Sequence, residues 1–488
     1  MSKVLMIGVD GLDPILLSRF ESKLPNFKEL KQRGTSIKHN SIFPYDSIPI
    51  WSSIYTGLTP AHHGLLKSIN YQKETSMDVD SSILSGKTFW DFAGSAGKKV
   101  CIINPFVAYP PWPVNGVMVS GPIGKNGSSK TYPSIIENKY RLPHLGGLHD
   151  RYPLKKDLMK FLEMAKRVTT SEADFALDLL REYEWDLALT VFITLDGVEH
   201  FFWRYYDKDD PTHPDNNTMK NVIPDFYGLI DSIVGRFREL DFDTLIIFGD
   251  HGMGLRSLKL VNINEVLRKR NLLSSKVQTN WGLGYKIDSL KSNVLNLIYK
   301  YNLDDGALML SRCVPKLSKK LIKSELSISS ENRTAFAADL VGMNSCGGIN
   351  IVKEKLEEAD YEGIRTLVLT DLQNLVSPLT GQKLVKWACR REKLYEGEFI
   401  NRYPDIVFEL EQTYGVSWGV GQLLNDNYAH KIISGGHKNE AVFIINGVFD
   451  KTLNKTEMSS IDIAPTVLDL LNVNGNYHFD GRSILCTQ

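Results

Sequence analysis

The chain has 488 residues, and its 57 basic and 57 acidic side chains leave a formal net charge of zero. This balance provides no general attraction to nucleic acid or to an anionic membrane surface. The hydrophobic fraction of 42% and the charged fraction of 23% are typical of a soluble globular protein. No stretch approaches the roughly 18 apolar residues of a membrane-spanning helix. The composition therefore indicates neither a nucleic-acid polymer nor a membrane as a partner, and it leaves the oligomeric state open.

The cysteines favour a reducing compartment. They are scattered along the chain and never form a Cys-x-x-Cys pair. Their positions are Cys101, Cys313, Cys346, Cys389 and Cys486. Isolated thiols are typical of a cytosolic protein rather than a disulfide framework or a zinc knuckle. The apolar run at the N-terminus is too short for a signal peptide, so we expect a cytoplasmic location.

Short apolar runs alternate with helical patterns along the chain. The runs predict strands at 4–9, 99–105, 187–195, 244–250 and 441–446. The helical patterns cover 24–33, 51–55, 155–183, 222–240 and 460–471. This alternation predicts an α/β fold with a largely parallel central sheet and helices on both faces. In such sheets, ligands bind beyond the carboxyl ends of the strands.

Two stretches depart from this rhythm. Residues 71–132 are rich in Pro, Gly and Ser and predict a strand-and-loop excursion. The longer stretch that follows residue 254 includes a Lys-rich helical segment at 316–323, which we interpret as a solvated helix face. We predict a catalytic core formed by residues 1–254 and 401–488, with residues 255–400 inserted as a cap region.

Three predicted strands run into an acidic residue: Asp10, Asp196 and Asp250. One acid at a strand end is usually a helix cap or a solvated loop residue. Here His251 follows Asp250 directly, and His200 lies four positions after Asp196, on the same face of a helix. The ordered set predicts a metal site at one edge of the sheet.

A further histidine, His437, follows Gly435 and Gly436, which allow the backbone to approach the site closely. Carboxylate oxygens and imidazole nitrogens are suitable ligands for zinc and similar ions. Two such cations about 3.5–4 Å apart would suit phosphoryl transfer. The candidate ligands form two groups, which are Asp10, Asp250 and His251, and Asp196, His200 and His437.

Ser47 is the candidate nucleophile, in the segment FPYDSIPIWSSIYTG. Pro49 suits the first turn of a helix, which places Ser47 at the N-cap or in that turn. Backbone N–H groups and the helix dipole favour a bound phosphate there, and a metal-bound serine alkoxide is an effective nucleophile. We interpret the neighbouring Asp46 as a cap or loop residue, and His63 as structural.

The ordered motifs IGVDGLDP, SIPIWSSIYTGLTPAHHG, DGVEH, DHGMG and GGH resemble the type I phosphodiesterase and nucleotide pyrophosphatase branch of the alkaline phosphatase superfamily. Weaker similarity extends to FDGRSIL near the end of the chain. The resemblance implies an alkaline phosphatase-like fold and two divalent metal ions, preferably Zn²⁺, with Mn²⁺ or Mg²⁺ as alternatives. It implies that one ion is held by Asp10, Ser47, Asp250 and His251, and the other by Asp196, His200 and His437.

Substrate-binding residues are less clearly marked. The family's nucleophile is often Thr, where this chain has Ser47. In the nucleotide pyrophosphatases an Asn binds a phosphate oxygen; its position here is Ser68, and Asn70 lies two residues further on. Trp203 and Tyr205 are candidates to stack on a base or a sugar, and a role in core packing fits them equally.

These observations predict a metal-dependent hydrolase of phosphate esters. We expect a phosphodiesterase or nucleotide pyrophosphatase that acts on a small-molecule phosphate ester or nucleotide-like substrate, through a covalent phosphoserine at a two-metal site. The alternatives are a phosphomonoesterase, a phosphonate hydrolase, a sulfatase, a phosphoglycerate mutase, or a metal-binding protein without turnover. The sulfatase alternative is weak, because Ile50 and Trp51 stand where the sulfatase pattern requires Ser and Arg.

Overall fold

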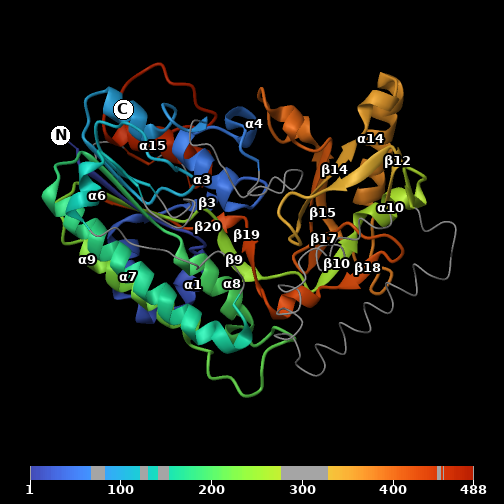
Figure 1. Cartoon of the computed structure of the whole chain (residues 1–488), viewed down its shortest axis with the longest axis horizontal. Helices are drawn as coiled ribbons and strands as arrows, with labels where there is room; N and C mark the ends of the chain where they lie inside the picture. Colours follow the sequence, from blue (N-terminus) through green and yellow to red (C-terminus); the bar gives the residue numbers. More distant parts are fainter. Residues whose placement is uncertain are drawn as a thin grey trace.

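The computed structural model describes residues 2–66, 83–120, 130–140, 153–275, 328–447, 452–453 and 456–486. The candidates Ser68 and Asn70 and the Lys-rich segment at 316–323 lie outside these ranges. Figure 1 shows two regions side by side, an α/β region that holds both termini and a smaller region rich in strands.

An eight-stranded sheet forms the centre of the α/β region, in the order β2-β21-β8-β1-β7-β4-β5-β6. Its five inner strands are parallel. They are β1 (Val4–Val9), β4 (Val100–Ile103), β5 (Gly116–Val119), β7 (Leu187–Phe192) and β8 (Thr244–Phe248). The antiparallel outer strands are β2 (Thr35–Ser36), β6 (Thr131–Tyr132) and β21 (Phe443–Gly447). Strand β1 is buried along its whole length between β7 and β8, which explains its unbroken apolar sequence.

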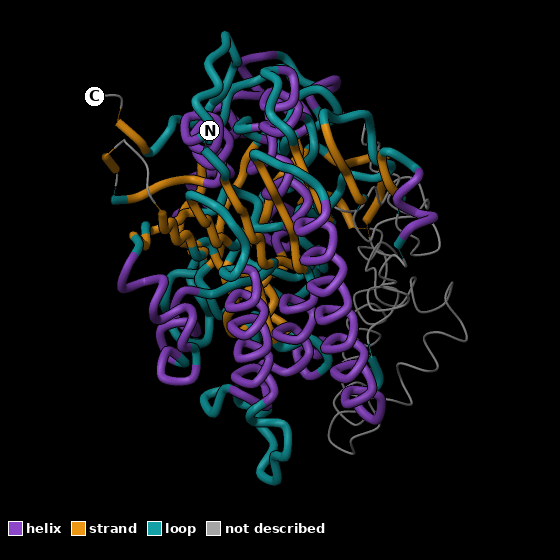
Figure 2. The backbone as a smooth tube through the Cα atoms, turned by 90° about the vertical axis from the view of Figure 1, so that its left-hand side faces the viewer, coloured by secondary structure: helices purple, strands orange, loops and turns teal. Residues whose placement is uncertain are grey.

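Helices cover both faces of this sheet (Figures 1 and 2). One face carries α3 (Ser47–Thr56), α5 (Phe89–Ser95) and α15 (Ile463–Leu470). The other carries α2 (Pro25–Arg33), α7 (Leu158–Glu182), α8 (Thr194–Tyr206) and α9 (Val222–Phe237). The predicted α/β fold with a largely parallel sheet is therefore confirmed. The strand predicted at 187–195 ends early, at Phe192, because the chain turns into α8 at Thr194.

Short elements surround this core. The helices are α1 (Pro14–Arg19), α4 (Pro60–His63) and α6 (Ile135–Lys139). The strands are β3 (Lys38–Asn40), β9 (Gly252–Leu255), β19 (Gly435–Lys438), β20 (Glu440–Ala441), β22 (Thr452–Leu453), β23 (Glu457–Ser459) and β24 (Leu485–Cys486). Within the described parts of the chain, no helix combines the length and apolar surface needed to cross a bilayer.

The smaller region has its own sheets and its own hydrophobic cluster. One sheet contains β13 (Ala335–Ala338), β14 (Cys346–Ile351), β15 (Val385–Arg390) and β16 (Ile406–Leu410). Another contains β10 (Lys259–Asn262), β17 (Tyr414–Ser417) and β18 (Leu424–Asp426). The remaining elements are α10 (Ile263–Lys269), β11 (Leu273–Ser275), β12 (Ile328–Arg333) and α14 (Glu358–Gln373). The division at residue 400 stays a prediction, and β16, β17 and β18 follow that residue.

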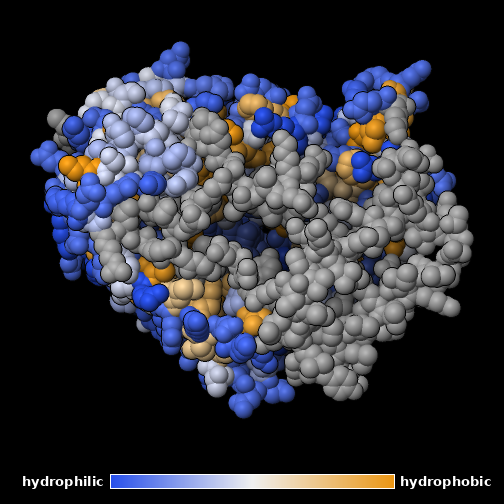
Figure 3. Space-filling model, viewed as in Figure 1, coloured by the Kyte–Doolittle hydropathy of each residue, from blue (hydrophilic) through white to orange (hydrophobic). Residues whose placement is uncertain are grey.

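The two regions meet beside the start of α3. Phe43 and Tyr45, which precede α3, pack in one cluster with Tyr403 and Val407 of the smaller region. The hydroxyl of Tyr45 donates to Oε2 of Glu409 on β16, over 3.1 Å. Figure 3 shows a hydrophilic recess near the centre of the molecule, where the two regions meet.

Candidate metal centre

The three predicted acids lie at the same edge of the central sheet. Asp10 follows β1 directly, Asp250 follows β8 after one glycine, and Asp196 lies in the first turn of α8. Since β8, β1 and β7 are adjacent and parallel, their carboxyl ends bring the three carboxylates together.

Gly11 allows this convergence. Its φ is +78°, a left-handed conformation that favours glycine. A Cβ at this position would lie 2.9 Å from Oε2 of Glu199 and 3.2 Å from Cα of Asp196. The Gly11 N–H donates to Oδ1 of Asp250 over 3.1 Å. The absence of a side chain therefore lets α8 and the end of β8 approach the end of β1.

The first predicted ligand group is assembled around His251. Its Nε2 lies 3.5 Å from Oδ1 of Asp10 and 3.4 Å from Oδ2 of Asp250. The hydroxyl Oγ of Ser47 lies 3.2 Å from the same Nε2 and 3.4 Å from Oδ1 of Asp10. The structure thus brings the candidate nucleophile and these three side chains to one point.

The second predicted group is assembled around Asp196. Its Oδ1 lies 3.2 Å from Nε2 of His200 and 3.3 Å from Nε2 of His437. The two Nε2 atoms are 3.0 Å apart. The ring of His437 also stacks on that of His251, with centroids 3.8 Å apart. The two groups are therefore neighbours, as a two-ion site requires.

All three histidines are oriented in the same way. Nδ1 lies 2.8 Å from the Gly435 carbonyl oxygen in His200, 2.8 Å from that of Tyr45 in His437, and 3.1 Å from that of Gly252 in His251. A ring nitrogen that faces a carbonyl oxygen must carry the hydrogen and donate it. In the neutral form of each ring, the Nε2 lone pair is then directed into the centre, which is the arrangement of metal-ligating histidines.

His437 reaches the centre because β19 lies against α8. Strand β19 pairs with β9, which follows His251 directly. A Cβ at Gly435 would lie 2.5 Å from the carbonyl oxygen of Glu199 and 3.0 Å from Cα of His200. Only glycine permits this approach, so the close backbone contact expected beside His437 is present.

Burial sets the electrostatics of the first group. It raises the pKa of Asp10 well above its usual range, and the charges of Asp250 and Asp196 add to this effect. Burial also raises the pKa of Asp250 to about 7. The same burial lowers the pKa of His251 well below its usual value. Acids that resist ionisation beside a base that resists protonation are groups that a cation would stabilise.

In the second group, the carboxylate of Asp196 is paired with the two histidines of the same group. Burial opposes the ionisation of Asp196, but His200 and His437 hold its pKa below the usual range. Burial works against a charge on His437, and Asp196 nevertheless raises its pKa. Burial lowers the pKa of His200 to about 4.

The side chains fit a divalent metal ion. Oδ2 of Asp250 is a buried atom without a hydrogen-bond donor among the described residues, and Oδ1 of Asp196 lies 3.2 Å from Nε2 of His200 and 3.3 Å from Nε2 of His437. These two oxygens face three Nε2 atoms, each of which offers a lone pair to a metal ion when its imidazole is neutral. A buried set of carboxylate oxygens and imidazole nitrogens that converge in this way suits zinc or a similar ion.

Ser47 is the first residue of α3, as its sequence context predicts. Asp46 is the N-cap, and its carboxylate accepts from the N–H of Ile48 over 3.1 Å. One turn later, Nε1 of Trp51 donates to Oδ2 of Asp10 over 3.2 Å. The helix thus holds Ser47 at its positive end and secures one of the carboxylates.

The other predicted side chains lie away from the solvent. Trp203 and Tyr205 are on α8 and are only 5% and 6% exposed. Nε1 of Trp203 donates to Oδ2 of Asp207 over 3.1 Å. Their burial favours the packing interpretation, and a role in substrate binding stays a prediction. His63 is buried and bonded to Oγ of Ser53 over 2.9 Å, in agreement with a structural role.

Sequence reasoning missed two residues that support the centre. Tyr45 orients His437 through its carbonyl oxygen, a group that every residue carries, so no side-chain signal marks it. Trp51 supports Asp10 through its ring N–H. Its spacing of four from Ser47 places both on one side of α3, which is a signal that the sequence did offer.

Comparison with known families finds one match along most of the chain. The model of the type I phosphodiesterase / nucleotide pyrophosphatase family matches residues 4–412. This range includes every candidate metal ligand except His437. Venom phosphodiesterase 2 of Crotalus adamanteus is 24% identical over 146 residues, which are 28% of this chain and 16% of the venom protein. The chain thus matches only a small part of that curated relative.

Solved structures share the fold. Phosphonoacetate hydrolase from Sinorhizobium meliloti 1021, in complex with phosphonoformate, aligns with a TM-score of 0.53 at 15% identity, over 97% of this chain and 95% of that chain. An inactive murine ectonucleotide pyrophosphatase / phosphodiesterase 5 in complex with AMP has a TM-score of 0.51 at 14% identity, over 100% of both chains. The human counterpart has a TM-score of 0.50, also at 14% identity and full coverage of both chains.

Proposed function

We propose, because the chain belongs to the type I phosphodiesterase / nucleotide pyrophosphatase family, that it hydrolyses phosphate esters at this metal centre with Ser47 as the nucleophile. The observation that carries the proposal is the common orientation of three histidines. Each Nδ1 faces a backbone carbonyl oxygen, and each Nε2 faces the carboxylates around Ser47. A purely structural cluster has no need for three such lone pairs at a single point.

The residues divide naturally between two ions. Asp10, Asp250 and His251, together with Ser47, would hold one, and Asp196, His200 and His437 would hold the other. Divalent ions bound there would neutralise the negative charge of the phosphoryl group and activate the serine hydroxyl. Zinc suits the donor set best, and manganese is the nearest alternative.

The protein's own groups position the reaction. Ser47 is held by α3, whose positive end favours a phosphoryl group beside its hydroxyl. Oγ of Ser47 loses its proton to solvent and attacks phosphorus, while the bond from phosphorus to the leaving oxygen breaks; the leaving oxygen keeps the electron pair of that bond and takes up a proton from water. Water then cleaves the phosphoserine and regenerates the hydroxyl.

We propose phosphate diesters, including nucleotide diesters, as the preferred substrates. A diester carries a second organic group that extends beyond the centre and gives the enzyme additional binding energy to use in the transition state. The smaller region meets the core beside Tyr45, two residues before Ser47, so it lies close enough to contact such a group. The murine relative solved with AMP motivates the inclusion of nucleotide esters.

The nucleophile is tested by Ser47→Ala. We expect kcat to fall by at least about 10³-fold, which corresponds to about 4 kcal/mol of barrier. Ser47→Thr is the matched control, because it restores a hydroxyl, and it should retain most of the activity. The melting temperatures of both variants should match that of the wild type. A Ser47→Ala enzyme that keeps more than about a tenth of the turnover would exclude this role.

The substrate class is tested with bis-p-nitrophenyl phosphate and p-nitrophenyl phosphate, assayed with zinc or manganese. We expect a higher kcat/KM for the diester. Equal or better activity on the monoester would indicate a phosphomonoesterase with the same nucleophile. Activity on phosphonoacetate alone would indicate a phosphonate hydrolase. A metal-loaded protein that acts on none of these would favour a binding protein without turnover.

A further inference from the structure

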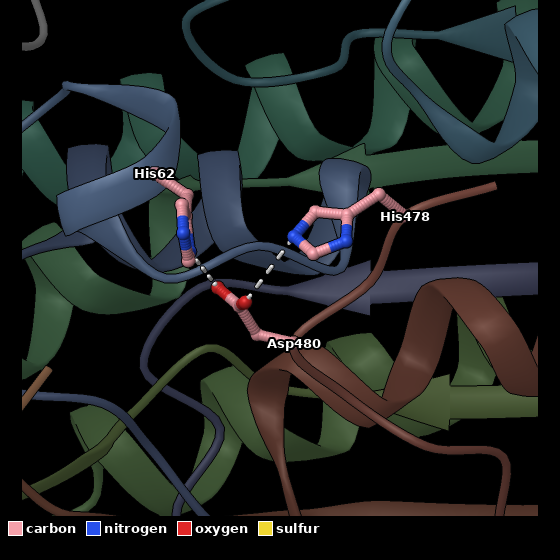
Figure 4. Close-up of side chains that lie close together, drawn as sticks. All are labelled: His62, His478 and Asp480. Carbon is pink, nitrogen blue, oxygen red and sulfur yellow. Dashed lines mark hydrogen bonds and ion pairs between the residues drawn. The ribbon is translucent and has the colours of Figure 1, made fainter. Parts of the chain in front are cut away.

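A second cluster of metal-ligating side chains lies apart from the metal centre. It is found where α4 meets the loop of residues 471–484 between α15 and β24, which we call the C-terminal loop. The cluster contains His62, His478 and Asp480 (Figure 4), with one ligand atom of each within 4.8 Å of the others. We propose that these three residues form a further metal site, which takes a divalent transition ion such as Zn²⁺ and ties the C-terminal loop to α4.

The distances fit such an ion. Nδ1 of His62 lies 2.7 Å from Oδ2 of Asp480, and Nε2 of His478 lies 3.9 Å from Oδ1 of the same carboxylate. Two ligands of a tetrahedral zinc ion are about 3.3 Å apart, because each bond is about 2.0–2.1 Å long. The two observed distances fall on either side of this value. Figure 4 shows both imidazoles turned toward the carboxylate, so small side-chain rotations bring all three onto one ion.

Two of the ligands are already held in place. Oδ2 of Asp480 accepts from the N–H of Thr59 over 2.7 Å, and the Asp480 N–H donates to the carbonyl oxygen of Gly57 over 2.9 Å. His62 belongs to the single turn of α4, and its N–H donates to the carbonyl oxygen of Thr59 over 2.9 Å. Little conformational entropy remains to be lost when an ion binds them.

The third ligand, His478, has an exposed side chain, and packed neighbours anchor its backbone. Tyr477 stacks on Phe92 with ring centroids 4.3 Å apart, and Phe479 packs where a Cβ of Gly57 would stand. These neighbours fix the chain on both sides of His478, whose side chain is 75% exposed. The imidazole is therefore placed beside Asp480 without serving the core, and its removal costs little packing.

The donor chemistry selects the kind of ion. Two imidazoles and one carboxylate suit zinc, nickel or copper, whereas magnesium and calcium prefer sites made of oxygen ligands. Three protein ligands leave a fourth position for water. Because its histidines reach the surface, the site would exchange its ion with solvent more readily than the buried centre around Asp250.

The test counts zinc on tag-free full-length protein dialysed against buffered free Zn²⁺. We expect His478→Ala to bind one equivalent fewer than the wild type. Asn476→Ala, an exposed change two residues away on the same loop, should bind as many as the wild type. An unchanged zinc count in His478→Ala, or an equal loss in Asn476→Ala, would overturn the proposal.

Thermal unfolding provides a second readout. An ion that binds only the folded chain stabilises it, so zinc should raise the melting temperature of the wild type more than that of His478→Ala. His62→Ala should show the same deficit. Turnover by His478→Ala should stay within about twofold of the wild type, or about 0.4 kcal/mol, because the site is separate from Ser47. An identical zinc-dependent rise in melting temperature in the wild type and both variants would show that hydrogen bonds alone hold the cluster together. This result would overturn the proposed metal site.

Discussion

Two of the places where the α/β region buries carboxyl groups differ in their neighbours. At the metal centre, Asp10 and Asp250 face the Nε2 atom of His251, and one oxygen of Asp250 has no donor among the described residues. On α7, Glu172 is only 1% exposed, and Nδ2 of Asn104 donates to its Oε1 over 3.2 Å. Its Oε2 also has no donor within the described parts of the chain.

The comparison shows that burial alone does not make a metal site. Burial raises the pKa of Glu172 to about 8, so this side chain is a neutral carboxylic acid at pH 7. Burial also raises the pKa of Asp10 and of Asp250, but there several carboxylates meet imidazole nitrogens. A proton satisfies the carboxyl group of Glu172. At the metal centre, only a metal cation satisfies the carboxylate oxygens and the imidazole nitrogens together.

The largest effect is expected from Asp250→Asn. The amide removes a negative ligand and offers N–H groups to a centre that holds lone pairs. We expect the variant to lose bound metal and at least about 10³-fold in kcat, or about 4 kcal/mol. Elemental analysis and turnover measure the two losses, and chelation of the wild type should reproduce them until zinc or manganese is restored. A metal-free preparation that remains fully active would remove the basis for the two-ion mechanism.

A smaller effect is expected from Glu172→Gln, and it is a gain in folding stability rather than a loss of metal and activity. The pKa of Glu172 is raised by burial from an ordinary 4.5 to about 8, so the folded state holds its proton where the unfolded state releases it. Each unit of pH between these values costs up to about 1.4 kcal/mol of stability. The contribution is intact below pH 4.5 and declines as pH rises toward 8.

Urea unfolding at pH 5 and pH 8 measures this contribution. We expect Glu172→Gln to resemble the wild type at pH 5 and to exceed it by about 2–3 kcal/mol at pH 8. All other titrating groups are common to both proteins, so the difference isolates Glu172. Activity should be unchanged. Parallel stability curves for the two proteins would show that Glu172 is ionised in the folded state.

The smallest effect is expected from Trp51→Phe, which removes the ring N–H that donates to Oδ2 of Asp10. Loss of a hydrogen bond to a metal ligand lowers metal affinity by about 10-fold or somewhat more. Zinc titration of the chelated protein measures this change, with activity at saturating zinc as a control for folding. An unaltered affinity would show that Asp10 is positioned by the end of β1 alone.

Much of this architecture could be predicted from the sequence, because it is encoded locally. The apolar run at 4–9 and the helix start at Ser47 depend on neighbouring residues, and the structure has both. The convergence of Asp10, Asp196 and Asp250 followed from their places at the ends of parallel strands. The assignment of these residues to particular ions stays a prediction.

Other features depend on contacts between distant segments. Strands β16–β18 pair with strands that precede residue 400, and the local pattern of each does not specify its partner. The carbonyl of Tyr45 supports His437 from nearly 400 positions away. Glu172 looks like an ordinary helix-surface acid in the sequence, and only the packing of α7 reveals its burial.

The central position of β1 has a consequence for how the protein is made. Strand β1 leaves the ribosome well before its two neighbours, β7 and β8, which begin only at Leu187 and Thr244. At about 5–20 residues per second, its apolar backbone waits for tens of seconds before both edges are paired. His437 is translated later still, so the nascent chain carries an incomplete centre until that residue has emerged. We expect this early exposure to favour binding of chaperones that shield apolar segments during translation.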